Sequence, residues 1–410
     1  MRIEYSKIFA LAFMLFATQA MWTVYNKYIP AYFAALGLGA AMAGVVVAWE
    51  KAAGIVLEPL AGRLSDGFKR RVARRLGWIL VPALAAAFCM SLIPDQVNWM
   101  PEALRGQPAA RAYARPFGVA VFFLLLAMAL FRAPVVALMP AFVPARHHDT
   151  ASGMFNLMTT MGARVADHAG SWLVRLSPGA PFWAAAGVLA LAAAVLARSV
   201  SRAEPVPARA EPDAAAEPPS PRHVGLLILA STAWLFAFSG FQAILPGYLK
   251  QSLPAEAAGA ANVLPAFLTA YALFSVPAAF AVQHWGRKPI MLSGLGTVLA
   301  SYLLIHAASS MDLVMVLANV AGLGWALVNT PALPMMLEGV PAGRHGLFAG
   351  MYYIGANIVG FLGPTVNPWI AASFSGWFGT AYFVPAVFLG LATAGVAFMR
   401  REPRGAETDA

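Results

Sequence analysis

The chain has 410 residues, of which 60% are hydrophobic and 11% are charged, and its formal net charge is +10. A soluble globular domain carries roughly 25% charged residues, so this composition excludes an ordinary water-soluble fold. The apolar residues show no period-two alternation in short segments, which argues against a transmembrane β-barrel.

The apolar residues instead gather into twelve long segments, most of them near the roughly 20 residues that a spanning helix needs. Arg2 and Lys7 before the first segment resemble the start of a secretory signal, but eleven segments follow, so we expect the first to be retained. Cys89, the only cysteine, should pack as a small apolar residue in the third. The sequence therefore predicts an all-α membrane protein with twelve transmembrane helices over residues 8–32, 40–61, 77–93, 116–139, 151–173, 181–197, 224–249, 259–282, 290–307, 313–336, 347–370 and 381–399.

The basic residues between these segments fall mainly in alternate loops. If the N-terminus is cytoplasmic, 19 Lys and Arg residues lie in cytoplasmic segments and five lie in outside loops. Because this is the bias of the positive-inside rule, we interpret the positive charge as a determinant of topology and not as a nucleic-acid surface. We expect a multi-pass protein of a bacterial-type inner membrane with both termini in the cytoplasm.

A segment rich in Pro, Ala and charge interrupts the series after the sixth span and has no apolar periodicity. Such a composition is typical of a flexible linker. It divides the chain into an N-terminal six-helix bundle over 1–197, a cytoplasmic linker over 198–223, a C-terminal six-helix bundle over 224–400 and a cytoplasmic tail over 401–410.

The two halves also share sequence. A shift of 197 residues aligns 134–154 with 331–351, and eight of the 21 positions are identical. Both windows contain the end of a fourth helix, a cytoplasmic turn and the start of a fifth. Parallel repeats of this kind build many secondary transporters, whose substrate sites lie at the repeat interface near the membrane midplane. The repeat therefore favours alternating access over catalysis.

Three ionisable residues, Glu50, Lys51 and Glu58, lie within the second span. An ionisable side chain costs on the order of 2.5–3.5 kcal/mol at the membrane centre, and at 100° per residue these three share one sector of a helix. A lysine between two carboxylates can hold one of them ionised and leave the other free to take up a proton. We expect ion coupling here, with a static ion network as the alternative.

The fourth and fifth spans carry further charges at membrane depth. Arg132 has no acidic neighbour in its own helix, so it can pair with Glu50 or Glu58 or bind a substrate oxygen. Arg164 and Asp167 are three residues apart and share one helical face. We expect these three residues to serve ion coupling or substrate binding, and for the last two an internal ion pair is the alternative.

The second half has few ionisable residues at membrane depth, and its polar residues are mostly amides and aromatic rings. Such side chains suit a sugar ring and equally suit other amphipathic solutes. We therefore expect ion coupling in the first half and a substrate cavity lined from both halves by Trp22, Tyr25, Asn26, Asn156, Gln242, Trp325, Asn329, Tyr353 and Asn357.

Residues 62–71 read Gly-Arg-Leu-Ser-Asp-Gly-Phe-Lys-Arg-Arg. This stretch resembles the 2–3 loop motif of the major facilitator superfamily, and 286–288, Gly-Arg-Lys, is similar to its weaker copy in the 8–9 loop. The resemblance covers nearly the whole chain and implies a two-bundle fold. It also implies a cytoplasmic gate in which Asp66 pairs with an Arg or a helix N-terminus and Gly62 allows close helix approach. If the basic residues do more than enforce orientation, the gate comprises Gly62, Arg63, Asp66, Arg70, Gly286 and Arg287.

A narrower resemblance is to the glycoside–pentoside–hexuronide:cation symporters and the related sucrose:proton symporters. Residues 58–62 (Glu-Pro-Leu-Ala-Gly), 132–140 (Arg-Ala-Pro-Val-Val-Ala-Leu-Met-Pro) and 350–353 (Gly-Met-Tyr-Tyr) carry it. Two positions depart from the pattern, since Ala141 and Gly54 stand where acidic residues are expected. The fifth span also lacks the Gly-Pro motif of drug antiporters.

These features predict a secondary active transporter, with a proton-coupled symporter for a sugar or glycoside as the leading hypothesis. The alternatives are an exporter or antiporter of an amphipathic metabolite or drug, a lipid flippase and, outside transport, a membrane receptor or scaffold. The sequence has no phosphate-binding loop, nucleophile motif or His-rich metal spacing, so we expect no enzymatic activity, no cofactor and no metal. The expected partners are a small-molecule substrate, protons or another cation and the lipid bilayer, with the monomer as the functional unit.

Overall fold

The computed structural model describes residues 5–39, 41–67, 72–201, 219–341, 343–373 and 378–399. Over these residues every regular element is a helix, in agreement with the fold class that the apolar segments predict. The gate candidate Arg70, the tail 401–410 and residues 202–218 of the expected linker lie outside the described residues.

The first half contains one long helix for each of the first six predicted spans, except that the fourth span is divided into two. Its α-helices are α1 (Tyr5–Ala35), α2 (Ala41–Asp66), α3 (Val72–Asn98), α4 (Ala114–Val136), α5 (Met139–Phe142), α6 (His148–Leu173) and α7 (Ala180–Ser201). Three short 3-10 helices lie in the connections, η1 (Glu102–Leu104), η2 (Pro108–Tyr113) and η3 (Ala145–His147).

The second half follows the same plan with two differences. The tenth span of the chain, which corresponds to the divided fourth span, is one continuous helix, and the eleventh span is divided into two. Its α-helices are α8 (Pro221–Ser252), α9 (Ala260–Trp285), α10 (Arg287–His306), α11 (Met311–Leu337), α12 (His345–Tyr352), α13 (Ile354–Ser373) and α14 (Phe378–Phe398). One 3-10 helix, η4 (Pro254–Gly259), connects α8 to α9.

Nine helical segments of the described chain are long and apolar enough to cross a membrane. The other three predicted spans are α2, α6 and α14. Three ionisable residues interrupt the apolar sequence of α2, and Arg164 and Asp167 interrupt that of α6. For α14 the described apolar stretch is Val384–Phe398, which is short of a full span. The charges of α2 and α6 therefore account for their absence from the nine apolar segments.

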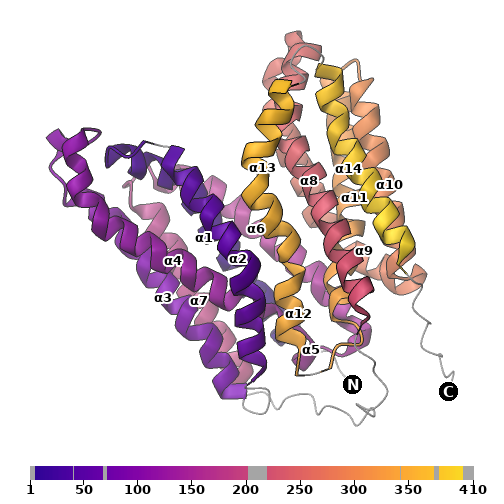
Figure 1. The fold of residues 1–410 in the computed structure, drawn as a ribbon, viewed down its shortest axis with the longest axis horizontal. Helices are drawn as coiled ribbons and strands as arrows, with labels where there is room; N and C mark the ends of the chain where they lie inside the picture. The colour runs from indigo at the N-terminus through magenta and orange to yellow at the C-terminus, as the bar shows by residue number, and fades with distance from the viewer. Residues whose placement is uncertain are drawn as a thin grey trace.

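The two halves meet through α2, α4 and α6 of the first and α9, α11, α12 and α13 of the second. Figure 1 shows α1–α7 and α8–α14 as two bundles that come together near α5 and α12 and diverge away from them. We call the end that holds Asp66, Asp149 and Arg287 the contact end. Lys7 near the start of α1 lies over Phe142 of α5 at this end.

The two divided spans break close to the interface between the halves. The α4 helix ends at Val136, soon after Pro134, whose ring removes a backbone donor. Between α12 and α13, the N–H of Tyr353 bonds to the carbonyl of Gly350 at 3.1 Å, which is a tighter turn than an α-helix makes. A broken helix at membrane depth is tolerated where it is buried in protein or lines a cavity. Both breaks border the cavity described next.

Candidate functional site: a cavity between the two halves

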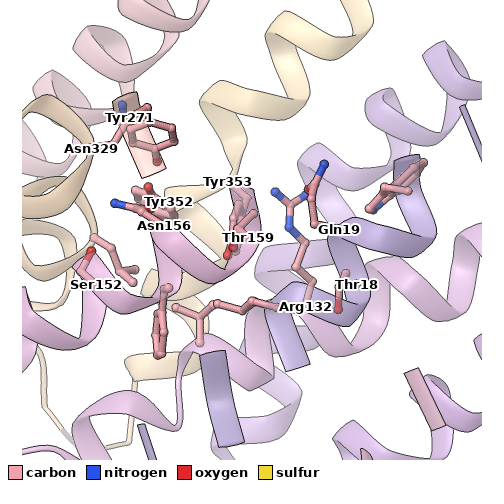
Figure 2. Close-up of a pocket in the computed structure, with 15 residues that line it drawn as sticks. Thr18, Gln19, Arg132, Ser152, Asn156, Thr159, Tyr271, Asn329, Tyr352 and Tyr353 are labelled. Carbon is pink, nitrogen blue, oxygen red and sulfur yellow. The ribbon is translucent and has the colours of Figure 1, made fainter. Parts of the chain in front are cut away.

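A cavity of about 160 Å³ lies between the two halves. The helices α1, α4 and α6 line it from the first half, and α9, α11 and the break between α12 and α13 line it from the second. Its volume is below the roughly 300–1,000 Å³ of drug-sized sites, so it suits a small solute. Figure 2 shows polar side chains entering it from both halves. They include Thr18, Gln19, Arg132, Asn156, Asn329 and Tyr353.

Two ion pairs lie along α2 beside this cavity. Oε1 of Glu58 is 3.4 Å from Nη1 of Arg132 on α4, and the carboxylate side chain is only 1% exposed. Two turns along α2, Oε2 of Glu50 is 3.0 Å from Nζ of Lys51. Lys51 therefore pairs with one of the two carboxylates, and Arg132 pairs with the other, which is one of the arrangements expected from the sequence. Both pairs are partly or fully buried. Removal of one partner would leave an unpaired buried charge, which destabilises the folded protein. A role for these residues in ion coupling stays a prediction.

Each of the two cations also lies over an aromatic ring of the cavity wall. Cζ of Arg132 is 3.9 Å from the ring centre of Tyr353, and Nζ of Lys51 is 4.1 Å from that of Trp22. Such cation–π contacts contribute about 0.5–2 kcal/mol. The stem of Lys51 packs against Gly360 of α13, where an added Cβ would lie 2.8 Å from the lysine Cγ. The ion pairs therefore contact both halves of the protein.

The charges of α6 lie away from the cavity. Nζ of Lys27, on α1, is 2.5 Å from Oδ1 of Asp167, and the two side chains are 35% and 48% exposed. The alternative of an internal pair between Arg164 and Asp167 is not what the structure has, because Lys27 pairs with the carboxylate across the α1–α6 contact. Arg164 makes no ion pair with any residue that the structure describes, and neither α6 charge lines the cavity. A role for these two residues in ion coupling stays a prediction.

At the contact end, the carboxylate of Asp66 lies at the N-terminus of α12. Its Oδ1 accepts the backbone N–H of Gly346 at 2.8 Å, and its Oδ2 accepts that of Leu347 at 3.0 Å. The first amides of a helix have no acceptor within the helix, and the helix dipole favours an anion there. The helix N-terminus is thus present as a partner of Asp66, which is one of the two arrangements expected for the gate.

The α2 and α12 helices cross with almost no space between their backbones. A Cβ on Gly62 would lie 1.9 Å from the carbonyl oxygen of Gly346, and a Cβ on Gly350 would lie 2.4 Å from Cα of Pro59. Small residues allow helices to approach in this way. The close approach expected at Gly62 is therefore observed, and it joins the two halves one turn from Asp66.

Repeat-related positions make a matching contact between α6 and α9. Gly153 corresponds to Gly350 in the aligned windows, and its Cβ would lie 2.5 Å from a backbone oxygen of α9. A shift of 217 residues places Gln283, near the end of α9, opposite Asp66 at the end of α2. Nε2 of Gln283 donates to Oγ1 of Thr150 near the start of α6 at 2.9 Å. The crossings α2–α12 and α6–α9 are therefore two versions of one contact.

Arg287, the first residue of α10, bridges two acidic side chains at the contact end. Its Nε is 3.0 Å from Oδ1 of Asp149 on α6, and its Nη1 contacts Oε2 of Glu338 after α11. Gly286, with φ +89°, turns the chain directly from α9 into α10, a conformation that glycine adopts without strain. Arg63 is exposed and makes no ion pair with the described residues. Arg287 therefore links the halves, whereas Arg63 does not.

Of the nine predicted cavity residues, Trp22, Asn156, Asn329 and Tyr353 line the cavity. Nδ2 of Asn329 donates to the carbonyl of Trp325 within α11 at 3.0 Å. Nδ2 of Asn156 has no hydrogen-bond partner among the described residues. Asn156 therefore contributes to the cavity wall an amide whose nitrogen is buried and unsatisfied in this conformation.

The other five predicted cavity residues lie elsewhere. Tyr25 is fully buried with its ring edge-on to Trp22. Trp325 is buried, stacked on one phenylalanine and tilted against a second. Asn26 is exposed one turn beyond the cavity on the same face of α1. Gln242 lines a second, more apolar cavity of about 480 Å³ between α8 and α13. Asn357 is buried against Gly54 of α2, where its side chain interacts with the carboxylate of Glu58.

Several lining residues were missed from the sequence because they are small or neutral. Their spacing carries a signal, since residues at i, i+3, i+4 and i+7 share one helical face. On α1 the stripe that faces the cavity is Leu15, Thr18, Gln19 and Trp22. On α6 the equivalent stripe is Ser152, Phe155, Asn156 and Thr159.

Two helical repeats with a cavity at their interface define the architecture of a secondary transporter. The sequence model of the Major Facilitator Superfamily matches residues 11–260 and 227–410 of this chain. Because these matches cover nearly all of the chain, the protein belongs to the major facilitator superfamily. It is therefore a multi-pass membrane transporter and not an enzyme. No curated protein matches the sequence.

Solved structures of this family share the fold at low sequence identity. The E. coli fucose:proton symporter FucP, in its outward conformation, is 14% identical, with a TM-score of 0.69 over 96% of this chain and 99% of that one. The proton:xylose symporter XylE, bound to 6-bromo-6-deoxy-D-glucose, is 14% identical, with a TM-score of 0.67 over 97% and 96%. A bacterial homologue of the iron transporter ferroportin, outward-facing with soaked iron, is 14% identical, with a TM-score of 0.68 over 97% and 99%. The narrower resemblance to the glycoside–pentoside–hexuronide branch is not confirmed.

Proposed function

We propose that this protein is a proton-coupled secondary active transporter that carries a small polar solute through the central cavity by alternating access. The observation that carries this proposal is the ion pair between Glu58 and Arg132. The carboxylate is buried beside the crossing of α2 and α12, whereas the guanidinium is 24% exposed and lines the cavity. The pair therefore connects the cavity to the interface that must open during transport.

A change in this pair gives a physical route to coupling. A buried carboxylate that loses its partner costs several kcal/mol as an ion, so it becomes neutral by taking a proton. The side chains facing Glu58 are Glu50 and Lys51 from α2, Arg132 from α4, Tyr353 from the helix break and Asn357 from α13. Apart from Arg132, the nearest cation is Lys51, which is already paired with Glu50. Movement of Arg132 toward a solute therefore favours protonation of Glu58.

The contact end supplies the alternation. In this conformation Asp66 holds the start of α12 and Arg287 holds Asp149, so both links must break before the halves separate there. From the bias of basic residues toward alternate loops we assign the contact end to the cytoplasm. The conformation is then the outward-facing one, and a solute enters from the outside.

Our hypothesis for the solute is a sugar or glycoside, transported by symport. The amide and hydroxyl groups of the cavity can bond sugar hydroxyls, and two of the similar structures are sugar:proton symporters. A third is a homologue of an iron transporter, so likeness of fold supports transport without selecting the solute. The cavity volume of about 160 Å³ favours a single small solute over a lipid or a drug.

Uptake into proteoliposomes tests this proposal. Purified protein would be reconstituted, and uptake of labelled sucrose, D-xylose and D-glucuronate would be measured under an imposed pH gradient and, separately, a sodium gradient. We expect uphill uptake of at least one solute under the pH gradient and its loss on adding a protonophore. A variant at Glu102, an exposed residue of η1, is the matched control: E102Q should transport normally. Uptake that follows the sodium gradient alone would show that proton coupling is wrong.

A further inference from the structure

The wall of the central cavity contains a single charge, and it is positive. Among the described residues that line the cavity, Arg132 alone is charged. Its partner Glu58 is buried behind it and does not line the cavity, so a solute meets the guanidinium and not the carboxylate. A cationic solute would lie against a cation, with no acidic side chain among the described residues that line the cavity. The electrostatics therefore favour an anionic group on the solute.

The hydrogen-bonding groups of the cavity point to the same chemistry. A guanidinium has five N–H donors, and the contact from Nη1 of Arg132 to Glu58 is a single long one of 3.4 Å. The amide nitrogen of Asn156 lacks a partner in the described structure. Gln19 adds an amide to the same wall (Figure 2). Arg132, Gln19 and Asn156 therefore place N–H donors in one wall of the cavity, with the guanidinium as the charged one.

The aromatic rings of the cavity are less available to a neutral sugar than the sequence suggests. One face of Trp22 is covered by Lys51 and one face of Tyr353 by Arg132. Stacking of a sugar on these faces would require the cations to move. A carboxylate bound to Arg132 instead leaves the guanidinium over its ring, where a cation–π contact and a charge-assisted hydrogen bond coexist.

Charge balance leads to the same conclusion. The two ion pairs beside the cavity contain Glu50, Lys51, Glu58 and Arg132, two acids and two bases, and their formal charges cancel. Addition of one proton to Glu58 would leave one excess positive charge in a region with little water. A solute with one negative charge neutralises that excess, because a buried charge is stable only when paired. A proton and a monoanion therefore fit this site together.

We infer that the cavity binds a small hydroxylated solute that carries one carboxylate, such as the anion of a sugar acid, and that Arg132 binds this carboxylate. The inference rests on the proposed function, which identifies the cavity as the substrate site. The solute carboxylate takes the place of Glu58 as a partner of the guanidinium, and the amides of Gln19 and Asn156 bind its hydroxyl groups.

Equilibrium binding by the purified protein tests this inference without any ion gradient. Thermal stability would be measured at constant ionic strength with two matched pairs of probes, D-glucuronate against D-glucose and D-gluconate against D-sorbitol. A ligand that binds only the folded state stabilises it by RT ln(1 + c/Kd) at free concentration c, so at equal concentration the tighter ligand raises the Tm more. We expect at least one acid anion to raise the Tm more than its neutral partner. Stronger stabilisation by the neutral partners, or no stabilisation by any of the four probes at tens of millimolar, would overturn the inference.

Two variants make the test specific to Arg132. E58Q removes the competing carboxylate, so the apparent affinity for the acid anion should rise. E58Q/R132Q removes both charges and avoids an unpaired buried ion, and its affinity should fall about tenfold or more relative to E58Q, as expected for loss of a charge-assisted hydrogen bond. Equal affinity in the two variants would overturn the inference. E102Q should bind as the unmodified protein does.

The two proposals can fail separately. If acid anions bind but their uptake does not depend on the pH gradient, proton coupling is rejected and the solute class still holds. Uptake of a neutral solute driven by the pH gradient, with no binding of acid anions, would reject the solute class and leave proton coupling intact.

Discussion

Asp66 of α2 accepts a hydrogen bond from the backbone N–H of Gly346, the second residue of α12, at 2.8 Å. The acceptor belongs to the first half of the protein and the donor to the second. A hydrogen bond to a charged group contributes about 1.5–3 kcal/mol, and the helix dipole adds to it. This contact therefore stabilises the conformation in which the halves meet at the contact end.

We predict that D66A shifts the population away from this conformation by about tenfold or more. The shift would be measured as a longer distance between spin labels at the exposed positions Arg63 and Arg344, attached to cysteines in a C89A background. D66N retains one acceptor oxygen without the charge and should produce a smaller shift. An unchanged distance distribution in D66A would show that this contact does not hold the halves together.

The second prediction concerns the crossing of α2 and α12. G62A would place a Cβ 1.9 Å from the backbone oxygen of Gly346, so the helices must move apart and the contact end should open in the same spin-label measurement. G44A lies on the same helix, where an added Cβ meets nothing within 4 Å. This control should leave the distance unchanged and alter stability by no more than about 1 kcal/mol, in the favourable direction. Equal effects of the two substitutions would contradict the account of the crossing.

The third prediction concerns the link between Arg287 and Asp149. R287Q leaves a carboxylate that is 7% exposed without its cation, at an expected cost of about 3–5 kcal/mol, seen as a lower Tm in detergent. D149N/R287Q should recover part of this loss because no unpaired charge remains. E338Q removes the more exposed partner and should have the smallest effect. Additive losses in the double variant would show that the two residues are not coupled.

The fourth prediction separates the two groups of intramembrane charge. D167N disrupts a pair with Lys27 that is exposed on both sides, and such pairs contribute about 0–1 kcal/mol. We expect its proton-driven uptake to remain within about twofold of the unmodified protein. Loss of uphill uptake in D167N with retained binding would assign coupling to α6 instead of α2 and α4.

Much of the fold follows from local sequence. The lengths of the apolar segments locate the spans, and even the charged helices α2 and α6 keep enough apolar residues to be found. Gly62 and Asp66 could be singled out because residues 62–71 resemble the 2–3 loop motif of the family. Their observed contacts have a physical reason, since a close helix crossing requires a residue without a side chain and a helix N-terminus attracts an anion. The repeat relates Gly153 to Gly350, and both lie at crossings between the halves.

The ion-pair partners of the intramembrane charges could not be predicted from the sequence. The helical positions of Glu50, Lys51 and Glu58 show that they share a sector, yet which carboxylate Lys51 takes depends on Arg132, which arrives from α4. In the same way Asp167 pairs with α1 and not with its own helix. Such pairings depend on the packing of neighbouring helices, which the sequence of one helix does not contain.

Depth along a helix is the second property that the sequence leaves open. Asn26 lies on the cavity face of α1, one turn beyond the cavity. Gln19 lies on the same face within it. Trp325 is on a helix that lines the cavity, but its ring is held among phenylalanines in the second half. A helical face can therefore be assigned from spacing, whereas the level of the cavity requires the three-dimensional structure.

The central claim is that Glu58 carries the coupled proton, and one comparison tests it most directly. Reconstituted E58Q and the unmodified protein would be compared in uphill uptake driven by a pH gradient and in counterflow, which needs no gradient, with the same solute. We predict that E58Q retains counterflow and loses uphill uptake, since the cavity still binds and alternates but no proton is carried. Uphill uptake that persists in E58Q at the level of the unmodified protein would contradict the claim.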